Sequence, residues 1–173
     1  LDLFFNDGKG AVKLDKADIT VGGEAREYTI EVIFTDLPKE VIVDATYRTS
    51  LSEEYLLNKD GDLDVIKKYS SGTKFSGTYI RAKHPMNPEC TNLLHKKAVE
   101  LRNIIRNQGI ECDKQTTNAV MRKAIWKKYA KDLQLALVDL DVTVGDDTKK
   151  IWAKLSSFLP VYSLFQSDRQ NTD

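Results

Sequence analysis

The feature that most constrains the fold is a change in the spacing of apolar residues near residue 84. From about residue 17 to residue 83, apolar and polar residues alternate, as in YTIEVIFTDL, where Tyr28, Ile30 and Val32 share one face of a strand. After the segment HPMNPEC, apolar residues recur at every third or fourth position, which is the spacing of an amphipathic helix. The sequence therefore predicts an α+β fold, in which an antiparallel β-sheet meander comes first and helices pack on it.

Turn signals divide the β-rich part into four or more short strands. Gly22-Gly23 precedes YTIEVIF, Pro38 opens a second β-rich run over 38–49, and Asp60-Gly61 marks the corner of a strand-turn-strand unit. A further strand is predicted in TKFSGTYIRAK, residues 73–83. We expect one face of this meander to be packed and the other to be wet.

Three helices are predicted after residue 85. The first lies in 91–109 and carries an apolar stripe of Leu94, Ala98, Leu101 and Ile105. The second lies in 116–134, with its core face formed by Val120, Met121, Ala124, Ile125 and Tyr129. The third, in 146–160, begins with two aspartates, as the helix dipole prefers, and we expect Trp152 and Phe158 to anchor it on the sheet. LALVDLDVTV reads as a β-rich link before this helix, and VYSLF as a final strand.

Length and composition favour one cytoplasmic domain. A chain of 173 residues is long enough to bury a core, and we expect a single domain over 1–173 with a β-rich part, 1–84, and a mainly helical part, 85–173, that ends in a strand. Lysine plus arginine and aspartate plus glutamate both number 26, so the net charge gives no general attraction to nucleic acid or membrane. Two cysteines do not make a disulfide framework, and no apolar run approaches the length of a membrane span.

Four patterns are similar to ligand sites, and each has a simpler interpretation. Gly8-Lys9-Gly10 lacks the spacing of a phosphate-binding loop and is predicted to be a turn. The alternating series Asn58, Asp60, Asp62, Asp64 lacks the glycine and glutamate of a calcium loop and is predicted to be a hairpin turn. The possible zinc ligands lack paired spacing and read as an ordinary buried thiol and an ordinary surface histidine; they are His84, Cys90, His95 and Cys112. Asp139 and Asp141 share one side of a predicted strand, but a solvated edge is favoured over Mg²⁺. No metal site is predicted.

The second predicted helix is rich in cations. Five of them fall within ten residues: Arg122, Lys123, Lys127, Lys128 and Lys131. Such a cluster can contact a phosphate backbone, although solvated helix faces are commonly lysine-rich as well. One hypothesis is therefore a non-enzymatic module that binds DNA or a protein through helix 119–131.

A second hypothesis rests on a resemblance along nearly the whole chain. The segments LDLFFND, ADITV…REYTIEVIFTDLP, NAVMRKAIW and LPVYSLFQSDRQNTD resemble the AAA-type ATPases of the SMC-like and OLD (overcoming lysogenization defect) group. The resemblance implies a fragment of an ABC/SMC-type ATPase head, its first lobe, with Leu1 just after the phosphate-binding loop. It implies a parent that binds ATP and Mg²⁺ and acts in DNA repair or anti-phage defence. The implied partners are the rest of the head, a second head as in a homodimer, and DNA, but no membrane.

The same resemblance assigns roles to the end of the chain. It implies that Gln166, at the exit of the predicted final strand, reaches the nucleotide's Mg²⁺ and the attacking water, and that Asp168 and Arg169 sense the γ-phosphate or the opposing head. A plain strand-capping role for Gln166 stays open. The 173 residues contain no GxxxxGK[ST] motif and no Walker B acidic pair. We therefore expect no catalytic residue, no bound cofactor and no ATP hydrolysis in this chain alone.

Overall fold

The computed structural model of the protein describes residues 1–15, 18, 27–37, 48–70 and 74–164. In chain order its elements are α1 (Asp2–Asn6), β1 (Glu27–Phe34), β2 (Leu63–Ser70), β3 (Phe75–Pro85), the short 3-10 helix η2 (Leu93–His95), α2 (Ala98–Asn107), α3 (Asn118–Lys128), β4 (Leu135–Asp141) and α4 (Asp146–Ser156). The predicted α+β class and the three predicted helices are confirmed, and α1 is a fourth.

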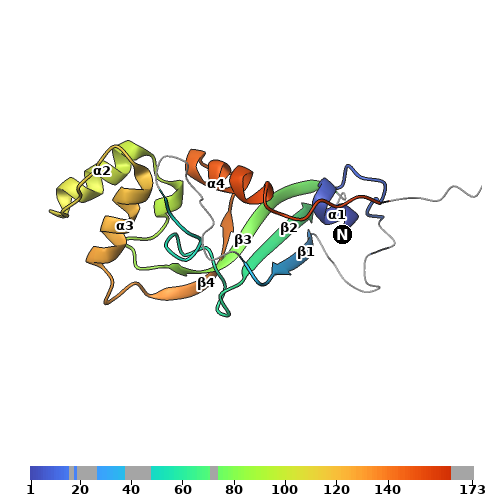
Figure 1. Ribbon diagram of the computed structural model, residues 1–173, viewed down its shortest axis with the longest axis horizontal. Coiled ribbons are helices and arrows are strands. Elements are labelled where there is room, and N and C mark those ends of the chain that lie inside the picture. The colour runs from blue at the N-terminus through green and yellow to red at the C-terminus, as the bar shows by residue number, and fades with distance from the viewer. Residues whose placement is uncertain (16–17, 19–26, 38–47, 71–73, 165–173) are drawn as a thin grey trace, which may run out of the picture.

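The four strands form one antiparallel sheet in the order β1-β2-β3-β4 (Figure 1). Each strand pairs with the next one along the chain, so the sheet is the meander that the alternating pattern predicts. In β1 every second residue is exposed, and Tyr28, Ile30 and Val32 lie on the half-buried face as predicted. The run LALVDLDVTV supplies β4, which pairs with β3.

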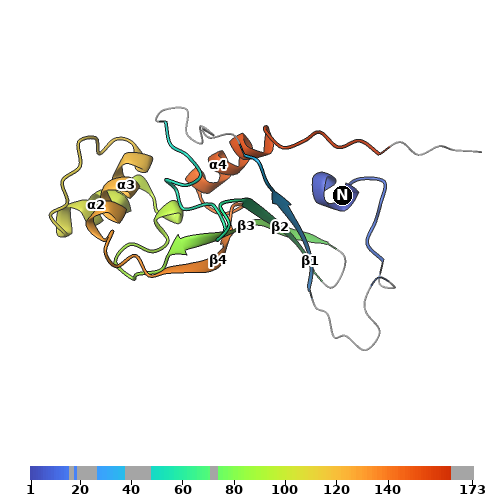
Figure 2. The ribbon, with the colours of Figure 1, turned by 60° about the horizontal axis from the view of Figure 1, so that its bottom comes forward.

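The helices lie on one face and at the two ends of this sheet (Figure 2). Helix α4 covers the inner face of the sheet with Ile151 and Leu155, which are 4% and 2% exposed. Helices α2 and α3 pack against each other at one end, and α1 lies at the other. The predicted stripe of the first helix is confirmed, because Leu94, Leu101 and Ile105 are buried in the same core. An extended backbone at Lys96 splits that helix into η2 and α2.

Several local predictions need correction. The turn at Asp60-Gly61 forms, and the side chain of Asn58 accepts the N–H groups of Asp60 and Asp62, but the described residues before it form turns instead of a strand. Residues 161–164 form no strand, since they follow α4 as an extended segment without a ladder partner among the described residues. Most of the predicted β-rich run 38–49 lies outside the described residues.

The prediction that Trp152 and Phe158 anchor the third helix, α4, on the sheet needs correction. Phe158 is 57% exposed and Trp152 is half-buried, so Ile151 and Leu155 anchor α4 in their place. The aromatic residue that is fully packed is Trp126 of α3, which is 3% exposed and absent from the predicted core face. Trp152 nevertheless contacts the core from its rim.

Candidate functional site

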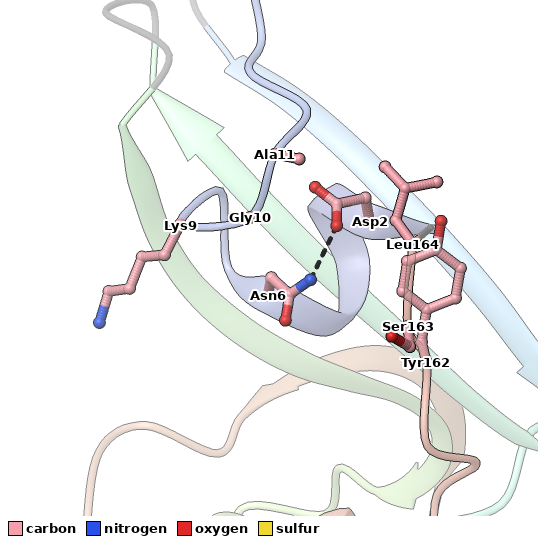
Figure 3. A pocket seen from close by; sticks show the side chains of 8 residues that line it. All are labelled: Asp2, Asn6, Lys9, Gly10, Ala11, Tyr162, Ser163 and Leu164. Atoms are coloured by element: carbon pink, nitrogen blue, oxygen red, sulfur yellow. Dashed lines mark hydrogen bonds between the residues drawn. The ribbon is translucent and has the colours of Figure 1, made fainter. Parts of the chain in front are cut away.

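A cavity of about 500 Å³ lies between α1, the turn that follows it and the segment after α4 (Figure 3). The residues that line it come from both ends of the described chain: Asp2, Asn6, Lys9, Gly10, Ala11, Tyr162, Ser163 and Leu164. The figure shows Asp2, Asn6 and Tyr162 gathered around the cavity, while the side chain of Lys9 extends away from it.

The carboxylate of Asp2 shapes the N-terminal wall of this cavity. Its two oxygens accept hydrogen bonds of 2.8 Å from the side-chain amide of Asn6 and from the backbone N–H of Val12. These bonds fold the chain after α1 back onto the helix. A Cβ atom at Gly10 would lie 2.2 Å from Asp2 Oδ2, so this position accepts only glycine without rearrangement. The predicted turn at Gly8-Lys9-Gly10 is confirmed, with Gly8 at φ +70°.

Helix α1 is attached to the sheet through a buried lysine. Lys67 of β2 forms an ion pair with Asp7, and its amino group lies 5.3 to 5.7 Å from the ring centres of Phe4, Phe75 and Trp152. A cation enclosed by aromatic faces is stabilised by their quadrupoles, and the carboxylate partner compensates for its burial. The cluster therefore joins α1, the sheet and α4.

Stacked rings bring the segment after α4 to the same place. The rings of Phe5 and Tyr162 are 5.6 Å apart and inclined by only 12°. This contact carries the chain past α1 and along the cavity as far as Leu164, which is 42% exposed. The predicted sensing residues Gln166, Asp168 and Arg169 come directly after it and lie outside the described residues.

The basic helix does not present all five of its cations. Arg122 is 1% exposed, and its guanidinium donates to Glu54 at 2.8 and 3.0 Å and to Asp147 at 2.5 Å. The prediction that Arg122 contacts nucleic acid is therefore wrong, because the side chain is enclosed and bonded to two carboxylates. It joins α3 to the start of α4. Lys123 is exposed and pairs with Glu53 at 2.5 Å.

Three further cations of the predicted basic helix lie on the surface, at or just after the end of α3. Lys127, Lys128 and Lys131 are exposed around a hollow of about 380 Å³ at the end of α3, and no ion pair is recorded for them within the described ranges. These three lysines are the ones available to contact phosphate in this region, because Lys123 already pairs with the carboxylate of Glu53.

The outer face of the sheet carries a charged network. Arg81 donates to Asp139 at 2.9 Å and to both carboxylate oxygens of Glu31, at 3.1 and 3.2 Å, and Lys68 lies 3.5 Å from Asp139. Burial alone would raise the pKa of Asp139, but the hydrogen bond and charge of Arg81 lower it below its usual range. Asp141 accepts from the N–H and hydroxyl of Thr143. Both Asp139 and Asp141 are thus hydrogen-bonded to protein groups.

Asp64 is the buried carboxylate of this face. It is 3% exposed, its Oδ1 has no hydrogen-bond partner among the described residues, and burial together with the neighbouring Glu31 raises its pKa to about 6. The Asp64 carboxyl therefore binds more protons in the folded protein than in the unfolded chain between pH of about 4 and about 6, so its contribution to stability should fall as pH rises through this window.

Asp64→Asn should remove this loss of stability. The free energy of unfolding of the variant minus that of the parent should be larger at pH 7 than at pH 4. The reason is that the variant avoids an ionised carboxylate in a buried position at pH 7. Asp139→Asn is the matched control with the opposite sign, since the lowered pKa of Asp139 contributes stability that is lost as pH falls. Urea denaturation between pH 7 and pH 4 measures the effect at Asp64, and its extension below pH 4 measures the opposite effect at Asp139. Parallel pH profiles for Asp64→Asn and the parent would contradict the assignment.

The four residues considered as possible zinc ligands do not form a metal site. His84 is 1% exposed, burial lowers its pKa to about 4, and its neutral ring donates from Nδ1 to the carbonyl of Tyr55 at 3.0 Å. His95 is half-buried with Nε2 2.8 Å from the carbonyl of Asp141, so neither histidine is the expected surface residue. Burial raises the pKa of Cys90 to about 11, which keeps it a thiol as predicted. Within the described ranges no three His, Cys, Asp or Glu residues are arranged to hold a metal ion.

Comparison with known proteins places the chain in a family. No curated protein and no solved structure matches it. None of the helices in the described parts combines the length and apolar character needed to cross a lipid bilayer. The model of one protein family, described as AAA ATPase domain, matches residues 1–173, which is the whole chain. The α+β architecture, with its antiparallel sheet and four α-helices, agrees with a lobe of such an ATPase. This chain belongs to the AAA ATPase domain family.

Proposed function

We propose that this chain is part of the ATP-binding head of an SMC-like or OLD-like ATPase, and that the segment after Leu164 senses the bound nucleotide. The observation that carries the proposal is the stack of Phe5 on Tyr162, because it holds residues 161–164, which come just before that segment in sequence, beside α1 in a chain of the AAA ATPase domain family. In the group that the sequence resembles, α1 corresponds to the helix that follows the phosphate-binding loop.

The cavity itself does not fit the phosphates of a nucleotide. Its wall carries the carboxylate of Asp2, which would repel them, and Lys9, the one cation among its lining residues, extends away from it (Figure 3). The 173 residues also lack the GxxxxGK[ST] loop whose amides and lysine hold phosphates. In the proposed head, the phosphates and Mg²⁺ are therefore held by residues outside this chain.

The proposal gives the end of the chain a distinct task. An amide side chain such as that of Gln166 can orient a water molecule or bind a cation through its oxygen without adding charge. Asp168 and Arg169 supply both signs of charge for contacts with phosphate or with a second head. A cytoplasmic protein that acts in DNA repair or anti-phage defence is the setting we infer from the resemblance.

The test needs the protein with its phosphate-binding loop present. Gln166→Ala should leave ATP affinity within a few-fold and lower turnover roughly 10²-fold, the scale expected when a group that positions water or metal is lost. Gln134→Ala is the matched control, because Gln134 is exposed at the start of β4, remote from the cavity. The 173-residue chain alone should show no turnover above blank. Full turnover of Gln166→Ala would reduce the glutamine to a structural role. Turnover by the chain alone would contradict the proposal that residues outside this chain hold the phosphates and Mg²⁺.

The alternative, a binding module for DNA or protein, loses part of its support. Arg122 is enclosed and Lys123 is paired with Glu53, so only the end of α3 remains for phosphate contacts. We therefore favour the ATPase head, in which contact between Lys127, Lys128 or Lys131 and DNA would be an accessory function.

A further inference from the structure

Among the described residues, strand β4 has no partner strand on one side, which leaves that edge of the sheet open. It is the last strand in the order β1-β2-β3-β4 and runs along the margin of the sheet in two views (Figures 1 and 2). The N–H of Val142 donates to the carbonyl of Thr78 on β3 at 3.1 Å. Because the direction of backbone groups alternates along a strand, Val138 and Leu140 also face β3. The N–H and C=O groups of Leu135, Leu137 and Asp139 then face outward, where no described strand pairs with them.

The open edge carries few of the devices that normally protect such strands, namely the charges of Asp139 and Asp141 in its second half. Its sequence, LALVDLD, contains no proline, glycine or lysine and has an apolar residue at five of its seven positions. Leu135 and Leu137 are 40% and 53% exposed on the outer face of the sheet. Proteins usually block exposed edges with charges, prolines or bulges, since unpaired backbone groups beside apolar side chains favour pairing with another strand.

We propose that β4 pairs antiparallel with β4 of a second copy of this chain, with the two-fold axis at Ala136. In this register the outward-facing residues pair with each other: Leu135 lies opposite Leu137 of the second copy, and Leu137 opposite its Leu135. The four leucines then form one apolar cluster on the outer face of a continuous eight-stranded sheet. Such a contact is isologous, so it closes after two copies.

Charge is complementary in the same register. Continued beyond the strands, this register brings Lys131 of one copy toward Asp141 of the other, while Asp139 keeps its ion pairs with Arg81 and Lys68. Opposite charges at both ends of the strand pair favour this register over a slipped one. In this register only residues 135–137 of the two β4 strands lie opposite one another, so the contact is short and we expect a weak dimer that dissociates on dilution through the micromolar range.

Self-association in the absence of nucleotide tests the proposal. Sedimentation equilibrium should show a monomer–dimer equilibrium, and Leu137→Lys should weaken it at least about tenfold, because a lysine on the edge opposes pairing. Ile33→Lys is the matched control: Ile33 is 50% exposed on the same outer face, but on β1. Circular dichroism checks that both variants fold. A parent that stays monomeric throughout, or a dimer that Leu137→Lys leaves intact, would overturn the proposal.

Crosslinking tests the register independently. Ala136 would meet its own symmetry mate as a non-hydrogen-bonded pair with Cα atoms about 4.5 Å apart, which is within reach of a disulfide. Ala136→Cys should therefore form a covalent dimer under mild oxidation, whereas the parent, with Cys90 and Cys112, and Ser156→Cys on α4 should not. Equal crosslinking of Ala136→Cys and Ser156→Cys would reject this register. Since no nucleotide and no residue after Leu164 take part, these outcomes are separate from those of the ATPase test.

Discussion

Replacing Arg122 with alanine should lower the free energy of unfolding by about 3–5 kcal/mol, because it leaves a buried carboxylate without its counter-charge. The side chains of Arg122 and Glu54 are both 2% exposed and meet through two hydrogen bonds. Asp147, at the start of α4, accepts a third from the same guanidinium. The substitution thus removes one group that satisfies two carboxylates from different parts of the fold.

Two further variants separate this effect from a general loss of charge. Lys123→Ala removes the neighbouring cation and its exposed pair with Glu53, and should cost no more than about 1 kcal/mol. Arg122→Lys keeps the charge but loses the planar fork that reaches two carboxylates, so its stability should be intermediate. Urea denaturation compares the three, and Arg122→Lys serves if the alanine variant does not fold. Equal losses for Arg122→Ala and Lys123→Ala would show that the network contributes no more than a surface pair.

The position of Arg122 illustrates what the sequence can reveal and what it cannot. Its spacing of three residues after Ala119 and four before Trp126 puts it on their buried face, so helical periodicity could have separated it from the lysines. Its partner Glu54 is 68 residues away in a segment without regular structure, and no local pattern predicts that contact. Charge counting alone therefore overestimated the basic surface of α3.

The sheet was predictable for a different reason. Alternation in β1 and the turn residues near Asp60-Gly61 are local signals, and a meander pairs strands that are neighbours in sequence. The candidate site depends instead on contacts between the two ends of the described chain, such as the stack of Phe5 on Tyr162. VYSLF has the composition of a strand, but strand formation needs a partner edge. Residues 161–164 contact α1 through a side chain and have no backbone ladder within the described parts.

Trp126→Ala should also cost about 3–5 kcal/mol, because it removes the largest aromatic side chain of the helical end of the core. The indole is 3% exposed and meets the ring of Tyr55 edge-to-face at 5.1 Å and that of His84 at 5.9 Å. Its Nε1 donates to the carbonyl of Cys90 at 3.1 Å. Truncation therefore leaves a cavity and an unpaired carbonyl at once.

Conservative and matched variants divide that loss into its parts. Trp126→Phe keeps a ring against Tyr55 and His84 but cannot donate to the carbonyl of Cys90. Its free energy of unfolding should fall by about 1 kcal/mol for the lost hydrogen bond, with a further loss for the smaller ring, which is less in total than for the alanine variant. Trp152→Ala is the matched control for size, and because Trp152 is half-buried at the rim of the core it should cost clearly less than Trp126→Ala. Thermal unfolding followed by circular dichroism ranks the three. A larger loss for Trp152→Ala than for Trp126→Ala would mean that α4, and not α3, carries the dominant aromatic anchor of the fold.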